Sequence, residues 1–157
     1  MKRIFCLSLV LALLLCACAF PVSAADEEPM VPVASYVTHF DDGSYCVTTI
    51  LQTPVEENGA ARAYKLTSGQ KASAYYASGV LQFTTYVKGT FKYNGSTAMA
   101  TTAQYSYSIA NSAWSFSSGS AHCSGATAYA TCTFYNSLNG NKSVTASLTC
   151  SPTGKLS

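Results

Sequence analysis

The chain has 157 residues, of which 48% are hydrophobic and only 10% are charged, and its formal net charge at pH 7 is +2. This length fits a single domain. No Asp or Glu follows Glu57, and the only histidines are His39 and His122. Acid-base, nucleophilic and hard-metal chemistry need such groups close together, so the composition argues against an enzyme, a metal site and any other cofactor. The pair His122-Cys123 has no partners at metal-ligand spacing, which favours a loop histidine beside a structural cysteine.

The first 25 residues have the layout of a secretory signal peptide. The basic pair Lys2-Arg3 precedes an uncharged run that ends at Phe20, and small residues follow. This order of basic, apolar and small segments is typical of a signal that is removed by cleavage. We therefore expect cleavage after Ala24 or Ala25, a secreted protein, and no membrane-spanning segment in residues 26–157. An alternative makes Cys18 the lipid-bearing cysteine of an anchored lipoprotein.

The charges of residues 26–157 are divided along the chain. All seven acidic residues lie before residue 58, and all seven basic residues of this part lie after residue 61. Such segregation predicts either an acidic segment that packs on the basic strands, or a basic face that meets an external polyanion such as a wall teichoic acid. A chance arrangement of solvated charges is the third interpretation, because surface charges often contribute little.

Residues 26–42 are predicted to form a flexible acidic arm, because prolines and acids leave this segment little to bury. The turn Asp41-Asp42-Gly43 then opens a strand from Ser44 to Leu51, and the sandwich domain is expected to span residues 43–157. A polar loop follows this strand, and Lys71–Ala77 is the next expected strand, turned by Ser78-Gly79.

The stretch from Leu81 to Ile109 carries apolar side chains at odd positions on both sides of Asn94-Gly95, which predicts two paired strands. Since both strands bury odd positions, the numbers of facing residues must sum to an even number, and the loop must hold an odd number of residues. We therefore expect a three-residue loop, Tyr93-Asn94-Gly95, with Gly95 in the left-handed conformation. That register places Phe91 opposite Thr97, Val87 opposite Thr101 and Phe83 opposite Tyr105.

The same alternation recurs near the C-terminus, where even positions from Ala126 to Phe134 and from Val144 to Cys150 are apolar. Parity again predicts a three-residue loop, Leu138-Asn139-Gly140, with Phe134 opposite Val144. With a short strand at Trp114 and Phe116, the count reaches about seven strands, and no helical periodicity is present outside the signal. We predict an all-β fold, a small antiparallel two-sheet sandwich of the Ig-like kind, with an open barrel as the alternative.

Four cysteines remain after the signal: Cys46, Cys123, Cys132 and Cys150. An even number in an exported chain predicts two disulfides. In the expected register Cys132 and Cys150 are out of step by about 13 Å, whereas a bridge needs alpha carbons about 4.4 to 6.8 Å apart. Two pairings stay open: Cys46 with Cys132 and Cys123 with Cys150, or Cys46 with Cys150 and Cys123 with Cys132.

Five residues are candidates for a binding surface. Tyr86, Tyr129 and Tyr135 fall at polar positions of expected strands, where an aromatic ring can stack on a sugar or a partner, and Lys88 and Lys92 belong to the basic part of the chain. Exposed tyrosine also suits a strand by propensity alone, so the tyrosines by themselves do not define a site.

Segments spread over most of residues 26–157 resemble a group of small exported proteins of Gram-positive, clostridia-like bacteria. The similar segments are Phe40–Tyr45, Gly89–Gly95, Trp114 and Leu148–Ser157. The resemblance implies export and a β-rich fold, and it carries no assigned activity, because these segments are turns, core aromatics and a terminal cysteine. It also implies a cysteine near Ala100 as the partner of Cys150, which this chain lacks.

We therefore expect a secreted, non-catalytic β-sandwich that binds a partner outside the cell or at its surface, such as a cell-wall or host glycan or another anionic polymer. We expect no nucleic-acid partner and a monomeric protein. Three alternatives stay open: a toxin or antagonist aimed at competitors, a structural component of the envelope, and, less favoured, an enzyme that uses the acids of the arm.

Overall fold

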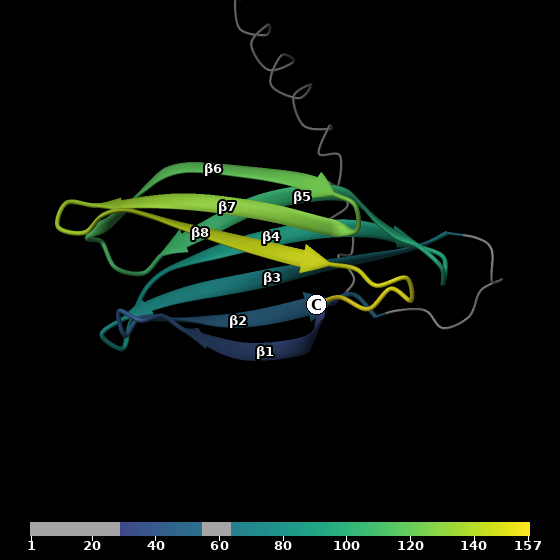
Figure 1. The fold of residues 1–157 in the computed structure, drawn as a ribbon, viewed down its shortest axis with the longest axis horizontal. Helices are drawn as coiled ribbons and strands as arrows, with labels where there is room; N and C mark the ends of the chain where they lie inside the picture. The colour runs from purple at the N-terminus through teal and green to yellow at the C-terminus, as the bar shows by residue number, and fades with distance from the viewer. Residues whose placement is uncertain (1–28, 55–63) are drawn as a thin grey trace, which may run out of the picture.

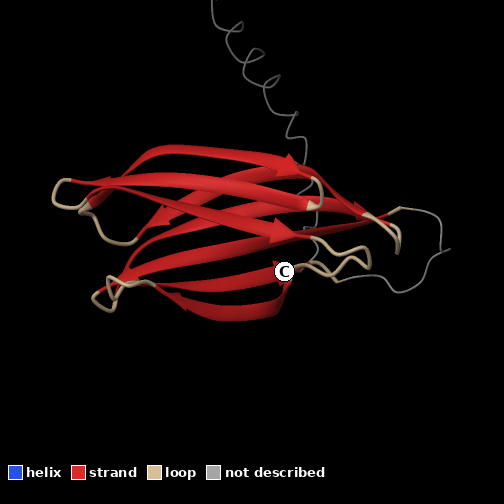
Figure 2. Ribbon diagram, viewed as in Figure 1, coloured by secondary structure: helices blue, strands red, loops and turns tan. Residues whose placement is uncertain are grey.

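The structure is a computed structural model, and it describes residues 29–54 and 64–157. Two antiparallel sheets pack face to face (Figures 1 and 2). The five-stranded sheet contains β1 (Val31–His39), β2 (Tyr45–Gln52), β3 (Lys65–Ala77), β4 (Val80–Tyr93) and β5 (Ala98–Ile109). The three-stranded sheet contains β6 (Trp114–Ser124), β7 (Thr127–Asn136) and β8 (Gly140–Thr149). The predicted all-β two-sheet sandwich is confirmed, with eight strands in place of about seven and no barrel closed by the described strands.

The predicted signal peptide, Cys18 and the acids at positions 26–28, 56 and 57 lie outside the described residues. Within the part that is described, no helix has the length and apolarity needed to cross a membrane.

Each strand pairs with its neighbour in sequence, so both sheets are meanders. Immunoglobulin domains instead exchange strands between sheets through Greek-key connections, so the likeness is one of layers and not of strand order. The predicted turn at Ser78-Gly79 is confirmed: both residues have positive φ, 51° and 75°, as a two-residue hairpin turn requires. β6 is longer than the predicted strand at Trp114 and Phe116 and continues to Ser124.

The central hairpin keeps the predicted faces from Ala103 to Ile109, but Met99 faces outward and Ala100 inward, and the register differs from the prediction. Val87 lies opposite Tyr105, not Thr101, and Phe83 lies opposite Ile109, not Tyr105. The loop has four residues, Asn94 to Thr97, because the Asn94 side chain accepts hydrogen bonds from the backbone of Ser96 (3.0 Å) and Thr97 (2.8 Å). A bulge at Thr101, between Ala100 and Thr102, restores the parity that an even loop would break. Gly95 is left-handed as predicted, with φ 87°.

The register of the last hairpin also differs from the prediction. Asn136 closes the loop against Gly140, so the three loop residues are 137–139, and Phe134 lies opposite Lys142 instead of Val144. The Asn136 side chain fixes this turn by accepting hydrogen bonds from the backbone of Leu138 and Asn139. A shift of two residues leaves every side chain on its predicted face, and it places Lys142 beside the core.

The core lies between the sheets in two clusters. One cluster is aromatic, with Phe83 stacked on Phe134 at 3.9 Å between ring centroids and Trp114 packed edge-on against Phe83 at 5.1 Å. The other is aliphatic and includes Val87, Leu148 and Leu156. These inner positions alternate with exposed or half-exposed ones along β2, β3, β7 and β8, which is the pattern a half-buried sheet produces.

The predicted arm over residues 26–42 is wrong for its central part, because Val31–His39 forms the edge strand β1. Its backbone pairs with β2 from Val31 opposite Gln52 to His39 opposite Tyr45. All nine residues of β1 are exposed, because the narrower three-stranded sheet does not reach over this edge. Backbone pairing thus forms the strand where the low hydrophobic burial of the segment had suggested none.

The predicted disulfides are absent from the described residues, where all four cysteines are free thiols. Cys46 and Cys132 belong to the aromatic cluster, whereas Cys150 belongs to the aliphatic one. Cys123 lies opposite Ala128, four residues from Cys132 along β7, which corresponds to about 13 Å and is too far for a bridge. The strand register therefore also excludes the pairing of Cys123 with Cys132.

Candidate functional site

A groove of about 460 Å³ opens on one long side of the sandwich, between the inner face of β1 to β3 and the outer edge of β8. We call it the side groove. Its lining mixes polar and apolar residues, and consists of Tyr36, Thr38, Phe40, Cys46, Thr48, Lys71, Ser73 and residues 142–147. It exists because the five-stranded sheet extends past β8, which leaves the inner face of β1 and part of β2 uncovered.

Lys71 occupies a core position of β3. Its cross-strand neighbours are Ile50 and Val87, both of which are buried. The Lys71 residue itself is 9% exposed, and its ammonium group lies 5.6 Å from the centroid of the Tyr36 ring. Among the described residues no carboxylate forms an ion pair with it. The aromatic ring compensates part of the desolvation of this cation but cannot neutralise it.

Lys142 enters the same groove from the other sheet. Its ammonium group lies 4.9 Å from the centroid of the Tyr75 ring and 5.3 Å from that of Phe40, and 3.9 Å from a carboxylate oxygen of Asp42. Asp42 also accepts hydrogen bonds from the backbone and hydroxyl of Ser44. These hydrogen bonds, assisted by Lys142, hold the pKa of the Asp42 carboxyl below its ordinary value. Asp42 is thus an anion that neutralises part of the charge of the Lys142 ammonium.

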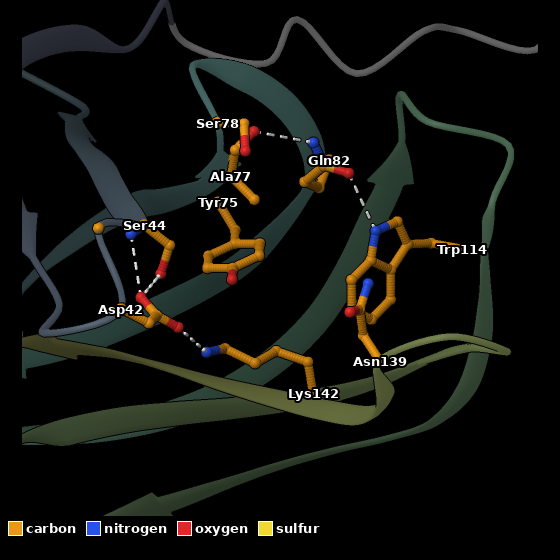
Figure 3. Close-up of a pocket in the computed structure, with 10 residues that line it drawn as sticks. Asp42, Ser44, Tyr75, Ala77, Ser78, Gln82, Trp114, Asn139 and Lys142 are labelled. Atoms are coloured by element: carbon orange, nitrogen blue, oxygen red, sulfur yellow. Dashed lines mark hydrogen bonds and ion pairs between the residues drawn. The ribbon is translucent and has the colours of Figure 1, made fainter.

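A second hollow, the end cleft, adjoins the side groove at Lys142 and has a volume of about 600 Å³. Figure 3 shows Lys142 reaching toward Asp42 on one side of the cleft, with Gln82 and Trp114 on the other. The Gln82 carbonyl oxygen accepts hydrogen bonds from the Trp114 indole (3.0 Å) and the Asn111 amide (2.8 Å), and its amide donates to the Val80 carbonyl (2.8 Å). These bonds satisfy Gln82, so the cleft wall is a fixed structural element.

The five surface candidates do not form one site. Tyr86, Lys88 and Lys92 lie on the outer face of β4, whereas Tyr129 and Tyr135 lie on the outer face of β7, in the opposite layer. The Lys92 ammonium lies 5.2 Å from the centroid of the Tyr64 ring, away from the side groove. Sequence reasoning missed Lys71 and Lys142, although the position of Lys71 in the buried phase of its strand was a readable signal.

Groups with catalytic chemistry are not brought together in the described part of the chain. His122 and Cys123 point to opposite faces of β6, and the imidazole stacks on Tyr129 at 5.0 Å between centroids. No three His, Cys, Asp or Glu side chains among the described residues are placed to hold a metal ion. Burial raises the pKa of the Cys46 and Cys132 thiols, and that of Cys150 to about 11, so these thiols are protonated and weakly nucleophilic at neutral pH.

The fold and this geometry define an antiparallel meander sandwich with a cationic groove on one open side. In comparisons with known proteins, no family model matches the chain, and no match was found among curated proteins or solved structures.

Proposed function

We propose that the protein is a secreted, non-catalytic binding module whose side groove holds an anionic segment of an extracellular polymer. The single observation that carries this proposal is the convergence of Lys71 and Lys142, from different sheets, on one groove where a single exposed carboxylate, Asp42, is the only described counter-charge. An anion placed there would neutralise a cation that the fold has largely removed from water, which is where charge pairing contributes most.

The surroundings of the two lysines suit a polymer carrying carboxylate or phosphate groups. Hydroxyls of Thr48 and Ser73 lie on the inner face between them and can donate hydrogen bonds to an anion. The described ranges contain six lysines and two aspartates, an excess of four positive charges that would attract such a polymer over distances of about a Debye length. No cofactor is part of the proposal.

The test is binding of residues 26–157 to poly(glycerol phosphate) and polygalacturonate at low ionic strength. Lys71→Gln and Lys142→Gln should each weaken binding about tenfold, equivalent to about 1.4 kcal/mol, and added salt should weaken it further. Lys92→Gln is the matched control, because Lys92 also lies over an aromatic ring but on the outer face of β4. Equal losses in all three variants would refute the groove as an anion site, and no binding to either polymer at low salt would exclude these two polymers as its ligands.

A further inference from the structure

The side groove contains an unfilled position for one β-strand. The backbone of Leu156 and Ser157 already pairs with the outer edge of β8: Ser157 and Thr149 exchange two hydrogen bonds of 3.0 Å, and Leu156 bridges Cys150 in the antiparallel sense. The Leu156 side chain points inward and is buried, close to Gly69 and Leu148. Two residues of the chain therefore occupy the start of a fourth strand of the three-stranded sheet.

The alternation of an antiparallel ladder determines which groups of β8 remain open. Because Thr149 directs both its N–H and its C=O to Ser157, every second residue back along β8 directs the same groups to that edge. These residues are Ser143, Thr145 and Ser147, and all three line the side groove. No other described strand pairs with this part of the edge.

The inward orientation of Leu156 determines which side chains of an added strand would also point inward. Inward side chains alternate with outward ones, so those in line beyond Leu156 would face the inner side of β2 and β3. Leu156 lies at Gly69, and Lys71 is the next inward residue of β3. Lys142 is an inward residue of β8 further along. The inner face thus presents ammonium groups to alternate side chains of the incoming strand.

We propose that the anionic ligand of the side groove is an extended polypeptide segment with acidic side chains at alternate positions, which pairs antiparallel with β8 in line with Leu156 and Ser157. This inference rests on the proposed anion-binding function and names its ligand. Backbone hydrogen bonds to Ser143, Thr145 and Ser147 supply affinity, and pairing of the acids with Lys71 and Lys142 supplies specificity, as in other strand-addition complexes. A polysaccharide has no amide ladder and would leave these backbone groups unused.

The test uses a synthetic octapeptide of alternating Glu and Thr. With Glu side chains inward, the Thr nitrogens face β8 and the Glu nitrogens face away from it. Methylation of the Thr nitrogens should weaken binding at least tenfold, whereas methylation of the Glu nitrogens should change it less than twofold. Binding should also slow hydrogen exchange of the Ser143, Thr145 and Ser147 amides.

Two protein variants separate the backbone N–H of residue 145 from its side-chain hydroxyl. Thr145→Pro removes one outward N–H and should reduce peptide binding, whereas Thr145→Val keeps this N–H and loses only the hydroxyl that bonds Thr131. If Thr145→Pro does not fold, the methylated peptides and the exchange measurement still decide.

Equal affinity of the two methylated peptides, or unchanged exchange at β8, would overturn strand pairing. If polygalacturonate binds in a Lys71-dependent way while the peptide does not, the ligand is a glycan and only this inference fails. If neither binds at low salt, the proposed function fails with it.

Discussion

The two long sides of the sandwich differ in how they are sealed. On the side of β5 and β6, Tyr107 stacks on Phe116 at 4.0 Å between centroids, and the Ala100 amide donates to the Gly125 carbonyl (2.9 Å), so rings and a backbone bond close the gap between the sheets. On the side of β1 and β8, lysines and hydroxyls line an open groove. The same layered fold thus combines a closed side with an open side, for which we propose ligand binding, and substitutions on the two sides should have separate effects.

The largest effect on the free energy of unfolding is expected from Phe134→Ala. Phe134 is fully buried and contacts the rings of Phe83, Tyr107 and Phe116. Its truncation should cost about 3 to 5 kcal/mol of unfolding free energy through lost transfer energy and a cavity. Urea unfolding followed by tryptophan fluorescence measures this, with Val37→Ala on the exposed β1 as the comparison, where we expect about 0.5 kcal/mol or less. Similar losses in both variants would contradict the division of roles.

Gly119→Ala tests how tightly the closed side is packed. A Cβ at residue 119 would overlap the ring of Tyr105, which covers this glycine from β5. We expect a loss of about 1 to 3 kcal/mol, because the ring must move or the sheets must separate. Ser120→Ala, next along β6 on the outer face, should be neutral. Unchanged stability of Gly119→Ala would show that the Tyr105 ring moves aside freely.

We expect the stability to depend on pH through Cys150, which pairs with Leu156 at one end of the open side. Burial raises the pKa of the Cys150 thiol from 9.0 to about 11, so between these values the folded state binds more protons than the unfolded state. Stability should therefore fall as pH rises from about 9 to about 11. Cys150→Ala should flatten this dependence in urea titrations at pH 8 and pH 11. An identical slope in the variant would assign the loss to other groups.

The smallest effect concerns Asp42. Asp42→Asn removes the carboxylate that shares the Lys142 ammonium, and the ion pair is solvent-exposed on both sides. Exposed pairs contribute about 0 to 1 kcal/mol, so binding to poly(glycerol phosphate) should strengthen by no more than about fivefold. Asp41→Asn removes a neighbouring charge without a described ion pair and serves as the control. Weaker binding in Asp42→Asn would mean that this carboxylate takes part in the site instead of competing for it.

Alternation predicted which side chains face inward, and these faces are correct along β7 and β8 and, from Phe83 onward, along β4. Register was not predictable, because it is decided by side-chain bonds within the turns, such as those of Asn94 and Asn136, and by the bulge at Thr101. β1 was missed because its own residues bury nothing.

The sequence indicates that Lys71 points to the inner face of its strand, but it does not indicate that this part of the inner face lines an open groove. That the three-stranded sheet stops short of β1 is a property of how two sheets overlap, and no local pattern records it. The five surface candidates do not form one site for the same reason. The sequence does not show that the outer faces of β4 and β7 point in opposite directions.

The bulge at Thr101 has a consequence for how this hairpin can vary in length. Removing Thr101 alone would leave Ala100 opposite Phe91 and Thr102 opposite Thr90, so the ladder would become regular and the inward residues of β5 would keep their orientation. Removing a residue beyond the bulge, such as Gln104, would instead turn the inward residues on one side of the deletion toward solvent. A single-residue deletion in β5 should therefore be accepted at the bulge and not further along the strand.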